Sequence, residues 1–168
     1  MNRHLVCIGE PIPKYGRIHP PELGNFAAAG LSWNNHAEVN LRTPDAPVIC
    51  VVDDDVSVVE GLVSLLESVG YTAVGFCSAE DFLNSPQLGR TACLILDVRM
   101  PGMGGLELQR RLLAKADDTP IVFVTAHGGS EISAEALRLG AAAFLSKPFS
   151  QESLLDAVRA ALARRAGT

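Results

Sequence analysis

The stretch VICVVDDD, residues 48–55, decides how this chain folds. Five apolar residues come first, as in a buried strand, and three aspartates follow them directly. Further along, four apolar residues recur at the spacing of one helix face, and a glycine stands where that helix would end: Val59, Leu62, Val63, Leu66 and Gly70. A strand that leads into an amphipathic helix in this way indicates the first unit of a parallel α/β sheet.

The same alternation of strand and helix continues toward the end of the sequence. Further short apolar runs predict strands over residues 72–76, 93–96, 121–124 and 142–145. Helices are expected from a Ser78 cap, over 105–114, over 132–139, and from a Ser150 cap to Arg165. Strict alternation with right-handed crossovers predicts an α/β fold: a doubly wound five-stranded parallel sheet, flavodoxin-like, with strand order 2-1-3-4-5.

The composition fits one principal domain with an acidic balance. The chain has 168 residues, of which 48% are hydrophobic, and its formal net charge is -5 at pH 7. Such a charge argues against direct binding of nucleic acid by this chain. No apolar run is long enough to span a membrane or to serve as a signal sequence, so we expect a cytoplasmic protein with no membrane partner. The four cysteines contain no CxxC pair, so neither a disulfide framework nor a zinc site is expected.

The first 46 residues differ in character from the rest. They hold five of the ten prolines and show no sustained period of a strand or a helix. We therefore expect residues 1–46 to form an N-terminal leader that is disordered or loosely packed, and residues 47–168 to form the folded domain.

Four of the predicted strands end on residues that carry chemistry. The first is followed by Asp53 and Asp54, the third by Asp97, the fourth by Thr125 and the fifth by Lys147. In a parallel sheet these ends share one edge, and the predicted strand order makes the first and third strands neighbours, so the carboxylates should converge. Clustered carboxylates repel one another unless a cation neutralises them, and Mg²⁺ prefers oxygen ligands of this kind.

The remaining side chains at this edge suit an incoming phosphoryl group. Lys147 supplies a positive charge and Thr125 a hydroxyl, and the small side chain of Ala126 leaves its backbone N–H approachable. Asp97 is the candidate nucleophile, since carboxylates that form aspartyl phosphates are established covalent catalysts. Taken singly, Asp97 could be a turn residue, Thr125 a strand-end hydroxyl and Lys147 a solvated lysine. Their occurrence together at one edge favours a phosphoryl receptor, whereas Asp55 is expected to cap the helix that follows it.

Four stretches stand out when the motifs are taken together: VVDDD (51–55), LILDVRMPGMGG (94–105), VTAHG (124–128) and FLSKPF (144–149). As a set they resemble the receiver domain of bacterial two-component response regulators, and within that family the subgroup similar to the nitrogen-fixation regulator J. The resemblance extends over about residues 48–165. It implies the receiver fold for this part of the chain.

The resemblance also implies a role for each matching residue of the site. Mg²⁺ would be held by three carboxylates and one backbone carbonyl, those of Asp53, Asp54, Asp97 and Arg99. Asp97 would accept the phosphoryl group. Lys147 would pair with that group, and its bond to the following proline would match the cis peptide of the family.

The same resemblance implies how the domain would signal. Phosphorylation would bias an equilibrium between inactive and active forms through the switch residues Thr125 and Phe144, while Arg99 and His127 lie where receivers tune dephosphorylation. The donor would be a histidine kinase or a phosphotransfer protein. The signal would pass to a downstream protein target or a missing output domain, with homodimer formation on phosphorylation as a further outcome. Such a domain accepts a phosphoryl group and can lose it, but it is not a turnover enzyme.

Two alternatives remain open from the sequence. A Mg²⁺-dependent phosphohydrolase of the haloacid-dehalogenase type also uses an aspartate nucleophile. There the nucleophile opens a DxD motif after the first strand, whereas Asp97 follows the third strand here and lacks the second aspartate. A degenerate receiver would act as a binding module without phosphorylation, although the set of site residues is complete in this sequence.

Overall fold

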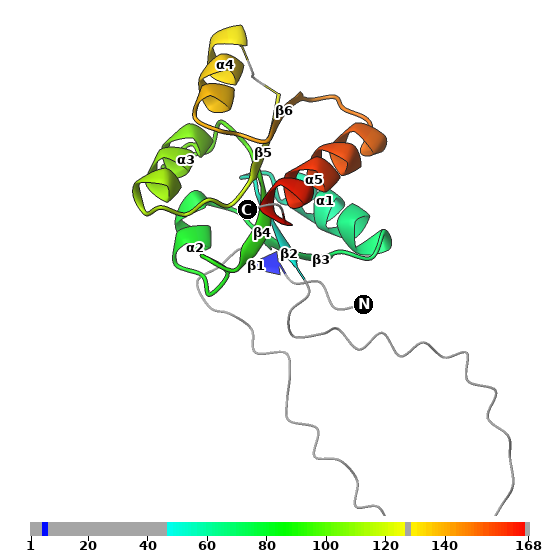
Figure 1. Ribbon diagram of the computed structural model, residues 1–168. Coiled ribbons are helices and arrows are strands. Elements are labelled where there is room, and N and C mark those ends of the chain that lie inside the picture. Colours follow the sequence, from blue (N-terminus) through cyan, green and yellow to red (C-terminus); the bar gives the residue numbers. More distant parts are fainter. Residues whose placement is uncertain (1–4, 7–46, 127–128, 167–168) are drawn as a thin grey trace, which may run out of the picture. The chain divides into compact units, whose positions relative to one another are not determined.

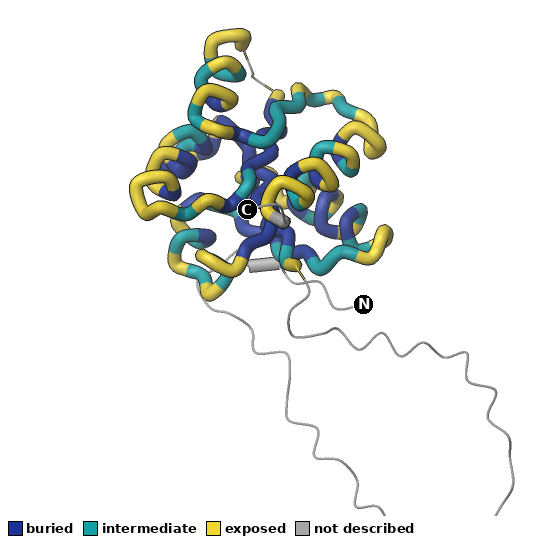
Figure 2. The backbone as a smooth tube through the Cα atoms, in the orientation of Figure 1, coloured by how far each residue is buried: buried dark blue, intermediate teal, exposed yellow. Residues whose placement is uncertain are grey.

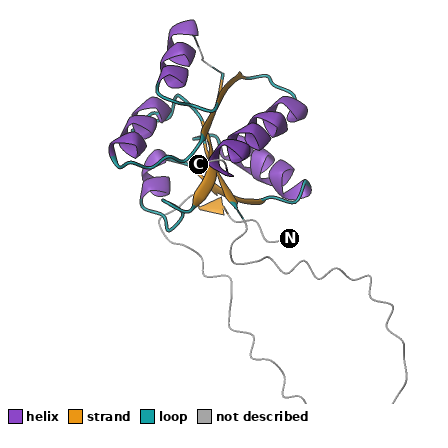
Figure 3. Ribbon diagram, in the orientation of Figure 1, coloured by secondary structure: helices purple, strands orange, loops and turns teal. Residues whose placement is uncertain are grey.

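The computed structural model describes residues 5–6, 47–126 and 129–166, which form a parallel β-sheet with helices on both faces (Figure 1, Figure 3). The strands are β1 (Leu5–Val6), β2 (Val48–Val52), β3 (Thr72–Phe76), β4 (Thr91–Leu96), β5 (Ile121–Thr125) and β6 (Ala143–Ser146). The helices are α1 (Val56–Ser68), α2 (Ala79–Leu83), α3 (Gly105–Ala114), α4 (Ser130–Arg138) and α5 (Gln151–Ala166). Within these ranges, no helix has both the length and the apolarity to cross a bilayer.

The sheet confirms the predicted topology. Its order is β1-β3-β2-β4-β5-β6 with every neighbouring pair parallel, so the five longer strands follow the order 2-1-3-4-5. β4 begins two residues earlier than expected, at Thr91, whose hydroxyl donates to the Gln87 carbonyl (2.8 Å) and lies 3.2 Å from Cys50 Sγ. Thr91 is polar and does not extend the apolar run, so the apolar pattern did not mark it as part of the strand. The order places β2 and β4 side by side at the centre, where the crossovers change direction.

Two hydrophobic cores hold the helices against the sheet, one on each face (Figure 1, Figure 2). Figure 2 shows the sheet as the buried centre, with exposed residues on the outer sides of the helices. The core under α2, α3 and α4 is built around Phe76, Phe82, Leu94, Leu96, Leu108, Leu112 and Phe123. The core under α1 and α5 is built around Ile49, Val51, Leu66, Ile95, Val122, Leu154 and Val158. Because both faces are covered, the central strands are mostly apolar, and polar side chains gather near their carboxyl ends.

Helix boundaries follow the predicted capping residues. Asp55 accepts a hydrogen bond from the Ser57 amide (2.9 Å), Ser78 from the Asp81 amide (3.1 Å), and Ser150 from the Ser153 amide (3.0 Å). Gly70 ends α1 with a φ of 93°, a conformation that a side chain would disfavour. The predictions for these caps are confirmed.

The two-residue strand β1 was not predicted. Leu5 and Val6 pair in parallel with Gly75 and Phe76 of β3, at the edge of the sheet. Two residues are too short for a periodic pattern, and their pairing depends on a strand about 70 positions away. The other residues of 1–46 lie outside the described part of the chain, so the leader stays a prediction. Contacts divide the chain into a unit of residues 1–10 with 47–168 and a unit of residues 11–46.

The expectation that the cysteines form no disulfide is wrong at Cys77. Cys77, directly after β3, is disulfide-bonded, whereas Cys50 and Cys93 are free and buried. The fourth cysteine, Cys7, lies outside the described residues. The prediction relied on CxxC spacing, and Cys77 has no other cysteine at that spacing.

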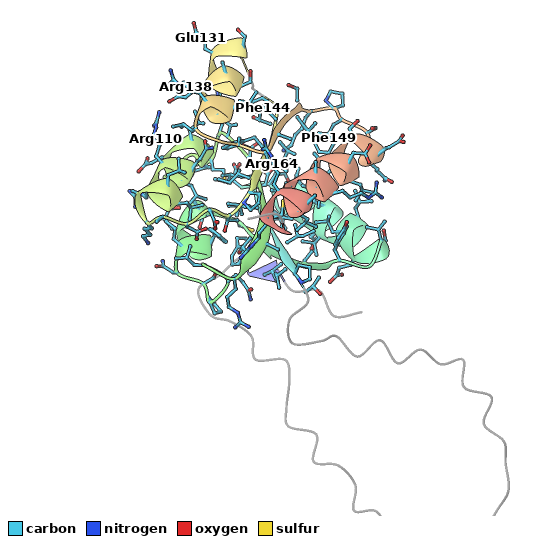
Figure 4. All side chains as sticks on the ribbon, viewed as in Figure 1. Arg110, Glu131, Arg138, Phe144, Phe149 and Arg164 are labelled. Carbon is cyan, nitrogen blue, oxygen red and sulfur yellow. The ribbon has the colours of Figure 1, made fainter. Side chains whose placement is uncertain are left out.

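Helix α4 is held by few buried contacts. Its one buried residue is Ala136. The amide nitrogen of Gln109 on α3 donates to the carbonyls of Ala136 (3.2 Å) and Leu139 (3.4 Å), at the C-terminal end of α4. An ion pair between Arg110, labelled in Figure 4, and Glu135 adds a second link to α3. The attachment of α4 thus combines these polar links with the packing of Ala136 and Ile132 against the core.

Candidate functional site

Backbone pairing brings the predicted strand ends together at one edge of the sheet. The amide of Asp97 donates to the Val52 carbonyl (2.9 Å), which sets the end of β4 beside the end of β2. The amide of Lys147 donates to the Thr125 carbonyl (2.8 Å), which sets the end of β6 beside the end of β5. The convergence predicted from the sequence is therefore present.

The ammonium of Lys147 joins the two buried carboxylates of this edge. Its Nζ lies 2.7 Å from Asp53 Oδ2 and 3.6 Å from Asp97 Oδ1. Asp53 and Asp97 are 2% and 6% exposed, so these charges interact with little screening by water. The closer partner of Lys147 is Asp53, which the sequence did not indicate. A buried carboxylate needs such a partner, because burial of an unpaired charge is costly.

The two oxygens of Asp97 have different surroundings. Oδ2 accepts a hydrogen bond from the Arg99 amide (2.6 Å), while Oδ1 faces Lys147. Burial raises the pKa of Asp97 above its ordinary value, and the charges of Asp53 and Asp54 raise it further. The Arg99 amide and the Lys147 ammonium act in the opposite direction but do not cancel the effect. Asp97 is thus a carboxylate whose ionised form the fold disfavours.

The raised pKa gives a prediction for stability. In acid below the ordinary value of 3.8, Asp97 is protonated in both the folded and the unfolded chain. As the pH rises, the unfolded chain releases its proton first, so ionisation of Asp97 lowers the free energy of unfolding. Asp97→Asn should therefore be more stable than wild type at pH 7 and have a higher Tm. The gain should shrink toward pH 4 in thermal melts, and a gain that is independent of pH would contradict this account.

The other predicted site residues lie around these carboxylates in different environments. Thr125 is buried at the end of β5, and Ala126 next to it is exposed. Asp54 is exposed, yet its charge still raises the pKa of Asp97. Arg99 is also exposed, and its backbone reaches Asp97. His127 lies outside the described residues.

The proposed switch aromatic, Phe144, lies on β6 (Figure 4). It is half-buried, and its ring centroid lies 6.0 Å from that of Phe123 on β5, with the rings tilted. Thr125 lies two residues beyond Phe123 on the same strand, opposite Ser146 in the register. The hydroxyl and the aromatic ring are thus on adjacent strands. The Lys147–Pro148 peptide is cis, as the resemblance implied.

The donor set suits a hard cation such as Mg²⁺. Three carboxylates and the backbone of Arg99 offer oxygen ligands, and Mg²⁺ in proteins typically takes one or two carboxylates and keeps several waters. Within residues 5–6, 47–126 and 129–166, no group of three His, Cys, Asp or Glu side chains is arranged to hold a metal by itself. Lys147 meets the charge of Asp53 instead. The residues present therefore fit Mg²⁺ in chemistry, and backbone and water oxygens would be needed beside the carboxylates.

Glu80, a residue of α2, also contacts the region next to the site, and sequence reasoning missed it. Its Oε1 accepts a hydrogen bond from the Met103 amide (3.0 Å), in the loop that follows Asp97. The two residues are 23 positions apart, and a glutamate in the first turn of a helix normally indicates only a favourable interaction with the helix dipole. No sequence signal for this contact was available.

Comparison with known proteins agrees with this geometry. The family model of the response regulator receiver domain matches residues 49–159. The response regulator protein TodT of Pseudomonas putida is 46% identical over 117 residues, which are 70% of this chain and 52% of TodT. The transcriptional regulatory protein FixJ of Azorhizobium caulinodans is 42% identical over 123 residues, 73% of this chain and 58% of FixJ. The chain thus spans about half the length of these curated relatives.

The solved structures agree on the fold. The structure of the response regulator StyR matches with a TM-score of 0.66 at 46% identity, over 73% of this chain and 62% of the StyR chain. The match to FixJ confirms the subgroup that the sequence motifs resemble. With a family model that covers well over half of its residues, the chain belongs to the response regulator receiver domains, the signalling modules of two-component systems.

Proposed function

We propose that this receiver domain takes up a phosphoryl group on Asp97 in a Mg²⁺-dependent reaction. The observation that carries the proposal is the placement of Asp97: a buried carboxylate at the sheet edge, with one oxygen held by a backbone amide and the other facing the Lys147 ammonium. The physiological donor would be a histidine kinase or a phosphotransfer protein, as is usual for this family.

Asp97 Oδ1 is the oxygen positioned to attack. It forms the new O–P bond while the bond from phosphorus to the donor breaks, and the leaving group carries away the electron pair of that bond. Oδ2 stays with the Arg99 amide, which keeps the carboxylate in one orientation. Lys147 is close enough to pair with the transferred group, since its Nζ already lies 3.6 Å from Oδ1.

Mg²⁺, when bound, would neutralise charge on the transferred phosphoryl group. The residues that would hold it are Asp53, Asp54 and Asp97, together with the backbone carbonyl of Arg99. Asp53 is paired with Lys147 in the structure, so the ammonium and a bound cation would both draw on this carboxylate. Thr125 and Ala126 at the end of β5 would supply a hydroxyl and an amide to the phosphoryl oxygens.

The signal would leave the site through Thr125 and Phe144. A phosphoryl group on Asp97 would draw the Thr125 hydroxyl toward it, and the space it leaves on β5 would be available to the ring of Phe144. The changed surface of α4 and β6 would bind a downstream protein, an output domain or a second receiver. The domain would act in the cytoplasm as a switch and not as a turnover enzyme.

Incubation with acetyl phosphate and Mg²⁺, followed by intact mass measurement, tests the proposal. The wild-type chain should gain one phosphoryl group, and EDTA should prevent the gain. Asp54→Ala should slow the gain by about tenfold at limiting Mg²⁺, because the variant loses one oxygen ligand. Excess Mg²⁺ should restore part of that loss. Equal labelling with and without EDTA would exclude a role for the metal, and no labelling of folded wild-type protein would favour a degenerate receiver.

A further inference from the structure

The loop between β4 and α3, residues 98–104, is anchored at both sides of its base. Val98, Met100 and Met103 are each buried in the core beneath α2 and α3. The Gly105 amide donates to the Val98 carbonyl (2.9 Å), which closes the loop at its base. The loop begins directly after Asp97, so its conformation sets the backbone around the phosphoacceptor.

Glu80 holds the far side of this loop. Its Oε1 accepts a hydrogen bond from the Met103 amide (3.0 Å). The same oxygen lies against Gly102, where an added Cβ would stand 2.9 Å from it. Gly102 has a φ of +73°, so the loop turns here in a conformation that a side chain would disfavour. The carboxylate thus occupies a fixed place against the turn.

Helix α2, which carries Glu80, is capped and packed against the core. Ser78 caps the helix by accepting from the Asp81 amide, and Phe82 packs against Phe76 with ring centroids 5.5 Å apart. Phe82 lies in the same core as Met100 and Met103 of the loop. Glu80 itself is exposed, so its hydrogen bond adds orientation rather than much stability.

A chain of contacts runs from Glu80 to the reactive carboxylate. Glu80 holds the Met103 amide beside the Gly102 turn, and Met100, which follows Arg99 in the sequence, is buried in the same core as Met103. The Arg99 amide in turn donates to Asp97 Oδ2. We propose that Glu80 is a positioning residue of the phosphoryl site: through the loop it holds the Arg99 backbone against Asp97 and so sets the rate at which Asp97 reacts. The expected effect on the reaction rate rests on the proposed function. The expected effect on the loop rests on the geometry alone.

Three single variants test the proposal. Glu80→Ala removes the acceptor, Glu80→Gln keeps an oxygen that can accept from Met103, and Asp81→Asn is a matched control on the same short helix. Backbone hydrogen exchange by NMR should be about tenfold faster at Met103 and Arg99 in Glu80→Ala, and near wild type in the other two. This measurement needs neither Mg²⁺ nor phosphorylation, so it stands even if the proposed function fails.

The rate of labelling by acetyl phosphate gives the second readout. At saturating Mg²⁺ the rate should fall by about three- to tenfold in Glu80→Ala, the lower end of the effect expected for residues that orient a reacting group from a distance. Glu80→Gln should recover most of the rate. A structural role in α2 alone would instead lower the Tm and leave the rate of the folded protein unchanged, which would overturn the proposal. Equal exchange at Arg99 in all variants would overturn it too.

A pair of glycine variants supplies an independent test. Gly102→Ala adds a strained φ and displaces the Glu80 carboxylate, whereas Gly89→Ala adds a strained φ of +75° with no atom within 4 Å of the new Cβ. Gly102→Ala should therefore slow labelling about as much as Glu80→Ala does, and Gly89→Ala should not. In the double variant Glu80→Ala with Gly102→Ala, the two effects on the rate should not add. Full additivity would show that Gly102 acts independently of Glu80 and would contradict the proposal.

Discussion

The Asp97→Asn variant will gain no mass from acetyl phosphate and Mg²⁺ under conditions where the wild-type chain gains one phosphoryl group. Asparagine keeps the size of the side chain and can still accept from the Arg99 amide, which lies 2.6 Å from Asp97 Oδ2. Its amide is not a carboxylate nucleophile, so the O–P bond cannot form there. We expect the labelling rate to fall by about a hundredfold or more.

The buried carboxylate of Asp53 is not placed to replace Asp97. Both oxygens of Asp53 are engaged, Oδ1 with the Asp55 amide (2.9 Å) and Oδ2 with Lys147 (2.7 Å). Asp156→Asn on the exposed side of α5 is the control, since that aspartate pairs only with the nearby Arg159 among the contacts of the described residues. It should label like wild type. Stoichiometric labelling of Asp97→Asn would refute the assignment of the nucleophile, whatever the fate of the metal proposal.

Gly105→Ala will destabilise the domain more than any other small substitution considered for this site. A Cβ at Gly105 would lie 2.2 Å from the Asp97 carbonyl oxygen and 3.1 Å from the Leu96 Cγ. The backbone directly after β4 would have to move, because the carbonyl of Asp97 cannot rotate away as a flexible side chain can. We expect a loss of about 3 kcal/mol or more in the free energy of unfolding, or about 10 °C in Tm.

Gly61→Ala is the matched control for that substitution. Gly61 lies in α1, and nothing approaches within 4 Å of a Cβ placed there. Alanine should therefore raise the stability by about 0.5 to 1 kcal/mol through its better helix propensity. Urea unfolding followed by circular dichroism measures both variants. Equal changes in the two would mean that the close approach of Gly105 to Asp97 does not limit the fold.

The fold could be predicted because local sequence patterns mark its strands and helices. Apolar runs bounded by polar or glycine residues marked all five longer strands, and the caps Asp55, Ser78 and Ser150 marked where three helices begin. The convergence of Asp97 and Lys147 at one edge also followed from strand order alone. A parallel sheet fixes which strand ends share an edge before any side chain is placed.

Contacts between distant segments were not predictable in the same way. Three features depend on residues far apart in the sequence: the pairing of Lys147 with Asp53 at 2.7 Å, the hydrogen bond from the Met103 amide to Glu80, and strand β1. None of them produces a periodic pattern or a motif in the sequence. The sequence thus predicted which groups gather at the site, while the choice among possible partners required the packed structure.

The single buried residue of α4 has a consequence for how much energy a signal requires. α1 and α3 each bury four residues, whereas α4 buries Ala136 alone among its nine. We therefore expect α4 to open locally at a lower free energy than unfolding of the whole domain requires. A difference of about 1.4 kcal/mol between two positions of α4 already shifts their populations tenfold. One new bond at the sheet edge could then redistribute the ensemble on this face while both cores stay intact.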